Sequence, residues 1–326
     1  MNPLTPVDAI EVEILVDNVT DNLSSVPAFV DVETSSLARR GFARVAGSCL
    51  CCAAHGLSCL ITIRRGEERH RLLFDTGPDA DVFERNASLL QVDLGTVEAI
   101  VLSHGHWDHG GAMLRALDMI RARNGGRAVD CHMHPGMFAT RAMKAADGTM
   151  RIMEDVPSIA ALNARGARVV CGSAPLALLD SGVHVSGEIP RVTAFERGMP
   201  GQYRRVDDAS PWEPDPLLMD ERFAAVHVAG KGLVVFTACS HAGVVNVLRH
   251  ARASFPGIPL HAVLGGLHLS GANESIIPET VAALRDFDLA TIAAGHCTGW
   301  RAITALANAF GDARLAPLAV GKRYRF

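Results

Sequence analysis

Short apolar runs alternate with longer stretches of helical periodicity along most of this chain. We expect strands at 11–16, 58–63, 71–75, 99–103, 168–170, 223–228, 233–238, 261–266 and 290–295. We expect helices near 80–90, 110–122, 135–146, 157–165, 242–253, 278–286 and 299–310. The segment Ala229-Gly230-Lys231-Gly232 is typical of a hairpin turn between two of these strands. This alternation predicts an α/β protein with layers of helix and sheet.

Two stretches break the pattern. Residues 20–56 show no clear periodicity, and residues 195–219 carry Pro200, Pro211, Pro214 and Pro216, too many for a regular element. A structureless stretch of this length is commonly functional, and we expect 195–219 to lie over the active site as a lid that limits substrate size. Since no linker divides the chain, we interpret residues 1–326 as a single domain with an irregular insertion around 195–219.

Composition narrows the classes of function. Hydrophobic residues make up 48% of the 326 residues and charged residues 20%, which supplies a sizeable core and excludes a disordered chain. The formal net charge of -4 and the aromatic content of 5% argue against a nucleic-acid partner. The first residues, MNPLTPVDAIEVEILVDN, have acids where a signal peptide needs Lys or Arg. Because no apolar stretch approaches the ~20 residues of a membrane span, we expect a cytoplasmic protein without a membrane partner.

The eight cysteines are interpreted as thiols, because disulfides belong to secreted proteins. Cys49, Cys51, Cys52 and Cys59 are close in sequence. Their C-x-C-C spacing lacks a second matching pair, so it does not predict a structural zinc site.

The strongest chemical signal is the run Ser103-His104-Gly105-His106-Trp107-Asp108-His109-Gly110-Gly111, which follows the apolar strand at 99–103. In an extended loop His104 and His106 point the same way, because side chains alternate with period two. Asp108 and His109 fall in the turn that enters a helix and are aimed differently. The run can therefore supply ligands to two adjacent divalent cations, of which zinc, iron and manganese suit imidazole and carboxylate.

This H-x-H-x-D-H run resembles the signature of the metallo-β-lactamase superfamily. Further matching motifs are Phe74-Asp75-Thr76-Gly77, His55-Gly56-Leu57-Ser58, His134-Pro135, Gly187-Glu188-Ile189-Pro190-Arg191, Cys239-Ser240-His241-Ala242-Gly243, Gly265-Gly266-Leu267-His268-Leu269 and Ala294-Gly295-His296-Cys297-Thr298-Gly299. Together they resemble the branch of metal-dependent hydrolases similar to 7,8-dihydropterin-6-methyl-4-(β-D-ribofuranosyl)-aminobenzene-5'-phosphate synthase, from about residue 11 to the C-terminus. The resemblance implies a four-layer αβ/βα sandwich, with Asp75 bracing the metal loop and His296 as the last histidine ligand.

The chain departs from the wider superfamily at two ligand positions. Where most members have a histidine and a bridging aspartate, this chain has Asp220 and Cys239. His241, two residues after Cys239, could supply the missing imidazole instead. The candidate ligands are therefore His104, His106, Asp108, His109, His241, His296, Asp220 and Cys239. We favour His241 over Asp220 as the third ligand beside His104 and His106, because imidazole is the commoner ligand for such metals.

Four other polar residues are candidates for substrate binding or for support of the ligands. His134 and His268 each follow an apolar strand, on the side of the sheet where ligand-bearing strands end. Glu188 lies in the GEIPR motif, and Arg191 could either pair with it or meet an anionic substrate group. The remaining histidines in strand or helix bodies are interpreted as surface or core residues; they are His70, His132, His184, His227, His250 and His261.

The resemblance implies a hydrolase with one or two divalent ions, zinc first and manganese or iron as alternatives. A metal-activated water would attack a phosphoester, a lactone or another ester-like small molecule. We assign Asp108 and His241 to the catalytic set, with Asp108 orienting the water or taking its proton. The alternative is a pterin-related condensing synthase that uses the metal as a Lewis acid. An oxygen-reducing enzyme is disfavoured, because the run has no glutamate between its histidines and no flavin domain follows. A homodimer is left open.

Overall fold

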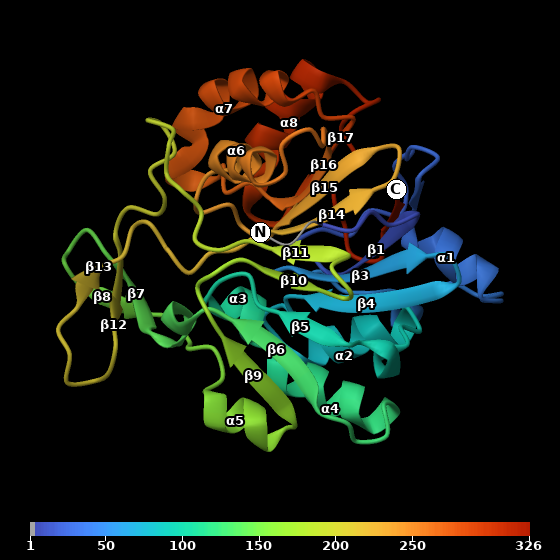
Figure 1. Ribbon diagram of the computed structural model, residues 1–326, viewed down its shortest axis with the longest axis horizontal. Coiled ribbons are helices and arrows are strands. Elements are labelled where there is room, and N and C mark those ends of the chain that lie inside the picture. Colours follow the sequence, from blue (N-terminus) through green and yellow to red (C-terminus); the bar gives the residue numbers. More distant parts are fainter. Residues whose placement is uncertain (1–3) are drawn as a thin grey trace.

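The computed structural model describes residues 4–326. Two large β-sheets pack face to face with helices on both outer sides, and these residues also form a smaller third sheet of four strands (Figure 1). The larger sheet has eight strands among these residues. Their spatial order is β2 (Val30–Asp31), β18 (Arg323–Arg325), β1 (Ala9–Val16), β3 (Ser58–Arg65), β4 (Glu68–Phe74), β5 (Ala99–Val101), β6 (Val129–Met133) and β9 (Ala167–Cys171). The second sheet has the order β10 (Leu176–Leu178), β11 (Val183–Val185), β14 (Ala224–Val228), β15 (Gly232–Thr237), β16 (Leu260–Gly266) and β17 (Thr291–Gly295).

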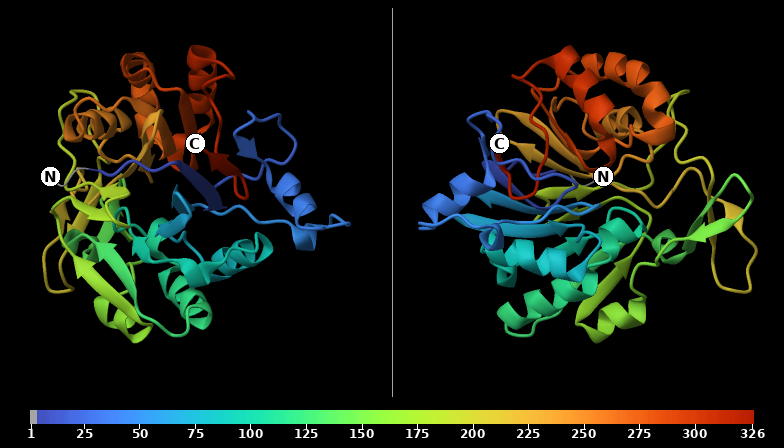
Figure 2. Two further views of the ribbon diagram at one scale, coloured as in Figure 1. Left: turned by 45° about the vertical axis from the view of Figure 1, so that its right-hand side comes forward. Right: turned by 180° about the vertical axis from the view of Figure 1, so that it is seen from behind.

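Helices cover the outer face of each sheet, as the two views of Figure 2 show from other sides. The larger sheet is covered by α2 (Ala80–Leu89), α4 (Met113–Arg123) and α5 (Ile159–Ala164). The second sheet is covered by α6 (Val244–Ser254), α7 (Ile277–Leu284) and α8 (Trp300–Phe310). Two short helices complete the set: α1 (Glu33–Arg39) follows β2, and α3 (Trp107–Gly110) follows β5. The expected αβ/βα sandwich is confirmed.

The strand periodicity explains why the layers form. In β15, Val234 and Phe236 point into the core between the sheets, whereas Leu233 and Val235 pack against the helices. This alternation follows from the period of two along a strand. Because both faces of the strand are buried, its sequence is an uninterrupted apolar run. The expected hairpin between β14 and β15 is present, with Val228 paired to Gly232.

The structure contradicts one expected helix. Residues 135–146 begin as a 3₁₀ turn at Pro135–Phe138 and continue as strand β7 (Thr140–Lys144). β7 pairs with β8 (Met150–Ile152) and with β12 (Gln202–Arg205), which in turn pairs with β13 (Glu213–Pro214). Pairing with a distant segment therefore overrides the local helical pattern.

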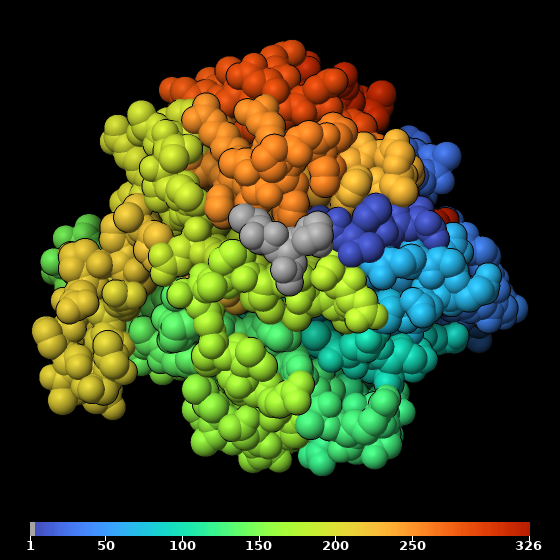
Figure 3. Space-filling model, viewed as in Figure 1, coloured from blue at the N-terminus to red at the C-terminus, as the bar shows by residue number. Residues whose placement is uncertain are grey.

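Two of these strands lie inside 195–219, the stretch expected to hold no regular element. Pro214 is in the edge strand β13, where a missing N–H costs no ladder hydrogen bond. The space-filling view in Figure 3 shows these hairpins standing out from one side of the molecule. In residues 4–326 no helix combines the length and the apolar character needed to cross a membrane.

Candidate metal centre

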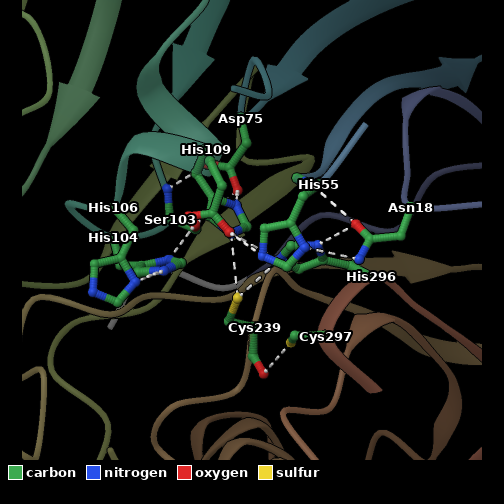
Figure 4. A network of polar contacts seen from close by, with 12 residues as sticks. Asn18, His55, Asp75, Ser103, His104, His106, His109, Cys239, His296 and Cys297 are labelled. Carbon is green, nitrogen blue, oxygen red and sulfur yellow. Dashed lines mark hydrogen bonds and ion pairs between the residues drawn. The ribbon is translucent and has the colours of Figure 1, made fainter. Parts of the chain in front are cut away.

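The polar residues of the sequence motifs gather where strands of both sheets end. The run at 103–111 follows β5, Cys239 and His241 follow β15, and His296 follows β17. Figure 4 shows His104, His109, Cys239 and His296 close together. Several residues of this region have left-handed backbone conformations that non-glycine residues rarely adopt. They are Asp75 (φ 59°), Ser240 (φ 60°), His268 (φ 46°) and His296 (φ 47°). Such a concentration of strained backbone is typical of functional sites.

The first group of ligand atoms belongs to His104, His106 and His241, all buried. His104 Nε2 lies 3.1 Å from His106 Nδ1 and 3.2 Å from His241 Nε2. A tetrahedral cation with bonds of ~2.0–2.1 Å holds its ligand atoms about 3.3–3.4 Å apart. The three nitrogens therefore already have nearly the spacing that such a cation requires.

The second group consists of Asp108, His109, Cys239 and His296. The Nε2 atoms of His109 and His296 each lie 3.2 Å from the sulfur of Cys239. Asp108 Oδ2 is 3.3 Å from His296 Nε2 and 3.6 Å from His109 Nε2. The rings of His104 and His109 have centroids 4.3 Å apart, so the two groups lie side by side. This is the arrangement that two-metal sites need, in which the cations are ~3.5–4 Å apart.

Four of the candidate histidines have their second ring nitrogen hydrogen-bonded away from the group. The pairs are His104 Nδ1 with Ser103 Oγ (2.9 Å), His109 Nδ1 with Asp75 Oδ2 (2.7 Å), His296 Nδ1 with Asn18 Oδ1 (2.9 Å) and His106 Nε2 with Gln202 Oε1 (2.7 Å). When the acceptor is a carboxylate or an amide oxygen, the proton is fixed on the outer nitrogen and the inner one keeps its lone pair. Such partners are typical of metal-ligating histidines.

Buried carboxylates hold the loops that carry these ligands. Asp75 Oδ1 accepts the backbone N–H of Ser103 at 2.7 Å, and its Oδ2 accepts the Ser103 hydroxyl as well as His109. Asp75 therefore braces the loop, as the resemblance implies. Glu221 accepts the N–H groups of His241 and Ala242 at 2.7 and 2.6 Å. Asp17 does the same for the N–H of His296 at 2.8 Å.

The two groups differ in charge. Burial and the neighbouring imidazoles hold the pKa values of His104 and His241 well below the ordinary value, and burial lowers the pKa of His106 to about 4. Burial alone would lower the pKa of His109, but Asp108 and Asp75 raise it to about 9. Burial alone would raise the pKa of Asp108, but His109 beside it holds that pKa well below its usual range. A cation in the second group must therefore displace a proton, whereas the first group is ready to bind.

The donor chemistry fits divalent metals. The first group offers three neutral imidazoles, and the second offers two imidazoles, a carboxylate and a thiol that becomes a thiolate when it binds. A third set of atoms, from Cys239, His268 and Cys297, adjoins the second group. The residues present could thus hold two cations of the zinc, manganese or iron kind.

Asp220 is not part of either group. Its Oδ2 accepts the N–H of Gly105 at 2.9 Å, and its Oδ1 lies 2.6 Å from Arg141 Nη2. In the structure its carboxylate is paired with the buried Arg141, and the alternative in which Asp220 joins His104 and His106 stays a prediction. His241 is the third residue beside His104 and His106 in the first group, and its role as a ligand stays a prediction.

The four remaining candidates differ in their surroundings. His134 Nε2 is 3.4 Å from Glu188 Oε1, and His268 has its ring centroid 4.3 Å from that of His241. Arg191 was expected to pair with Glu188 or to meet a substrate. Its guanidinium donates instead to the carbonyl oxygens of Ile189, Leu217 and Leu218, so it holds the chain that leads to Asp220.

Sequence reasoning gave no role to several residues that contact the groups or the loops that carry them: Asn18, Gln202, Glu221, Arg141 and Cys297. His55 was noticed in a motif but given no role. It lies beside Asp108, with Nε2 at 3.6 Å from Asp108 Oδ2, and burial and His296 lower its pKa. The one signal that could have indicated Asn18 is its position directly after the apolar strand β1. The insertion 195–219 does reach the centre through Gln202, although its effect on substrate size is still a prediction.

Comparison with known proteins gives concordant matches. A family profile described as the metallo-β-lactamase superfamily matches residues 56–141. The chain is 28% identical, over 76% of its length and 82% of the relative, to 7,8-dihydropterin-6-methyl-4-(β-D-ribofuranosyl)-aminobenzene-5'-phosphate synthase of Methanocaldococcus jannaschii. The fold is similar to a crystal structure described as a metal-dependent hydrolase of the β-lactamase superfamily (TM-score 0.70, 20% identity, 96% of this chain and 98% of that one). It is also similar to a metallo-β-lactamase fold protein of Bacillus subtilis (TM-score 0.53, 11% identity, 98% and 100%).

Proposed function

We propose, from the premise that this chain belongs to the metallo-β-lactamase superfamily, that it is a metal-dependent hydrolase of a phosphoester, a lactone or another ester-like small molecule. The observation that carries the proposal is the side-by-side placement of the two groups of ligand atoms. One is formed by His104, His106 and His241, and the other by Asp108, His109, Cys239 and His296. Zinc is the cation we propose first, because it accepts imidazole, carboxylate and thiolate together, with manganese and iron as alternatives.

Divalent cations bound there would supply Lewis acidity, which lowers the pKa of water and stabilises negative charge on an ester oxygen. The chain's own residues determine where that chemistry happens. Asp108 is largely buried, with its side chain 10% exposed and its carboxylate beside His296 and His109, where it would orient the attacking water or take its proton. We keep His241 in the catalytic set because its imidazole faces the same space as His104 and His106.

The surrounding residues fix the orientation of the ligand rings. The Nε2 atoms of His104 and His109 project from rings that Ser103 and Asp75 hold in place. A site whose groups are already oriented loses little free energy to reorganisation during the reaction. We propose a small-molecule substrate. The cytoplasmic location, the homodimer and the absence of nucleic-acid and membrane partners remain predictions.

The test is turnover of purified protein loaded with zinc, manganese or iron. A phosphodiester, a lactone and a thioester form the substrate panel, with Asp108→Asn and a chelated sample beside the wild type. We expect at least one substrate to be hydrolysed, and Asp108→Asn to lower kcat by about 10²–10⁴ if Asp108 takes the proton. No hydrolysis of any substrate by protein that holds two metal equivalents would contradict the proposal.

A second candidate is the condensing synthase. It is favoured by the 28% identity to a relative that is named a synthase, over 76% of this chain. Condensation forms a carbon–nitrogen bond, and no oxygen from solvent enters the product. Reaction in ¹⁸O-labelled water separates the two candidates, because hydrolysis incorporates the label in an acid product whereas condensation does not.

A further inference from the structure

His55 stands at the mouth of the centre and belongs to neither ligand group. Its side chain is 58% exposed, whereas the side chains of His109 and His296 are fully buried. Its ring centroid is 5.1 Å from that of His296 and 5.9 Å from that of Trp107. Figure 4 shows the His55 ring between Asn18 and the ligand groups. His55 is therefore a solvent-accessible imidazole beside the second group.

The orientation of the Asn18 amide fixes which nitrogen of His55 carries the proton. The backbone N–H of Gly56 donates to Asn18 Oδ1 at 3.0 Å, which identifies that atom as the oxygen. The other amide atom, Nδ2, lies 3.0 Å from His55 Nδ1. An amide nitrogen only donates, so His55 Nδ1 must accept. The ring is therefore neutral in this geometry, and its proton is on Nε2.

Asn18 places the proton of the neighbouring His296 on the other ring nitrogen, Nδ1. Its Oδ1 also accepts from His296 Nδ1, at 2.9 Å, so His296 keeps a lone pair on Nε2. That lone pair faces Cys239 and Asp108 in the second group. One amide thus prepares His296 to bind a cation and prepares His55 to donate a hydrogen bond.

Among residues 4–326, the Nε2–H of His55 has no acceptor within hydrogen-bond distance. Asp108 Oδ2, at 3.6 Å, is beyond the range of a hydrogen bond. The donor is therefore directed toward the carboxylate of the second group and is free for an atom that comes from solvent. A neutral donor beside a cation site suits an oxygen that carries negative charge or develops it.

We propose that His55 is a substrate-binding residue whose neutral Nε2–H donates a hydrogen bond to a phosphoryl or acyl oxygen of the substrate beside the second ligand group. The inference rests on the proposed function for the presence of such an oxygen. The assignment of the proton to Nε2 rests on Asn18 and Gly56 alone.

The first test measures the affinity of zinc-loaded protein for inorganic phosphate by titration calorimetry. We expect His55→Ala to weaken phosphate binding about tenfold or more, as the loss of a hydrogen bond to a charged group does, with zinc content unchanged. His70→Ala is the matched control. His70 lies near the start of β4, whereas the centre is at the other end of that strand, and its ring pairs with Glu98. Equal affinity in His55→Ala and wild type would overturn the inference, and so would loss of zinc from His55→Ala, which would make His55 a support of the metal site.

The second test replaces the Asn18 amide group that donates to His55 Nδ1 with a carboxylate oxygen that accepts from it. In Asn18→Asp one carboxylate oxygen still accepts from Gly56 and His296, but the other must accept from His55 Nδ1–H, so the lone pair moves to Nε2. ¹⁵N NMR of the zinc-loaded protein should show the His55 proton on Nε2 in the wild type and on Nδ1 in Asn18→Asp. Asn18→Asp should lower phosphate affinity more when His55 is present than in the His55→Ala background. The comparison corrects for the negative charge that the variant adds in both proteins.

These outcomes separate the two proposals. Zinc-loaded wild type that binds no phosphate and hydrolyses no ester would contradict the proposed hydrolase, and the NMR assignment would still decide the state of His55. A wild-type ring protonated on Nδ1 would overturn the inference even in an active hydrolase. An Asn18→Asp effect of equal size in both backgrounds would overturn it as well, because the loss would then come from charge alone.

Discussion

Arg141 and Asp220 form a buried ion pair that encloses the peptide of Gly105 between the first two histidines of the centre. Arg141 Nη2 is 2.6 Å from Asp220 Oδ1, and both side chains are 2% exposed. Asp220 accepts a hydrogen bond from the N–H of Gly105, and Arg141 Nη1 donates to the carbonyl oxygen of Gly105 at 3.0 Å. A Cβ at position 105 would clash with Arg141 Nη1 and with the backbone of Met137, so the glycine permits this close approach. The pair therefore sets the spacing of His104 and His106.

We expect Asp220→Ala to destabilise the protein by roughly 3–5 kcal/mol, because it leaves Arg141 charged and buried without its closest partner. Urea denaturation measures the effect. The double variant Arg141→Met/Asp220→Leu should recover much of the loss, since it removes both charges. Asp215, whose Oδ2 is 3.4 Å from Arg141 Nε, limits the cost, and Asp215→Asn should be milder. An Asp220→Ala protein as stable as wild type would refute this account of the pair.

Metal stoichiometry distinguishes the candidate ligands. His241→Ala should remove one of two metal equivalents, because it leaves only His104 and His106 in the first group. Cys239→Ser should keep both equivalents, since Asp108, His109 and His296 still provide three ligands in the second group. Elemental analysis of the purified variants measures this, with His70→Ala as control. Two tightly bound equivalents in His241→Ala would show that this imidazole is not a required ligand.

The ligand-bearing loops could be predicted because each follows a short apolar strand, and the strands that carry them, from both sheets, end beside one another. The contacts that orient the ligands could not. Asn18 and His296 are 278 positions apart in sequence, and His106 and Gln202 are 96 apart. Such pairs depend on the tertiary arrangement of both sheets, which local periodicity in the sequence does not predict.

The choice between Asp220 and His241 shows the same limit. Both residues lie in loops beside the centre, and ligand chemistry favoured His241 without excluding Asp220. The buried Arg141 occupies Asp220, yet Arg141 lies in a segment whose pattern predicted a helix. That segment is a strand because it pairs with residues 202–205. Because a helix was expected there, the local pattern did not indicate that Arg141 would pair with Asp220.

Asp17 should make stability depend on pH in a particular direction. Burial raises its pKa to about 6, although His296 opposes the shift, whereas 3.8 is its ordinary value. Between these values the folded state binds a proton that the unfolded state has lost, so stability falls as pH rises through this window. Above it the carboxylate is ionised in both states and the full cost of up to roughly 3 kcal/mol is present.

Asp17→Asn removes this titration while an amide oxygen can still accept the N–H of His296. The free energy of unfolding of metal-free Asp17→Asn, relative to wild type, should therefore rise as pH increases from about 4 to above 6. Denaturation at several pH values measures the difference. A constant difference between the two proteins would contradict the raised pKa, whatever its size, because the hydrogen bond to Val19 that the variant loses carries no pH dependence.

The insertion 195–219 should be restrained through Gln202, whose Oε1 accepts a hydrogen bond from His106 Nε2 at 2.7 Å. Its tip at 206–209 is exposed, and Arg205 offers a site for a protease that cuts after arginine. If the segment closes over the centre, phosphate bound to the zinc-loaded protein should slow cutting within 195–219. Gln202→Ala should speed cutting, because the segment loses this contact with the ligand loop, whereas His70→Ala should cut at the wild-type rate. Cleavage patterns and rates that are the same with and without phosphate would show that the segment is not a lid.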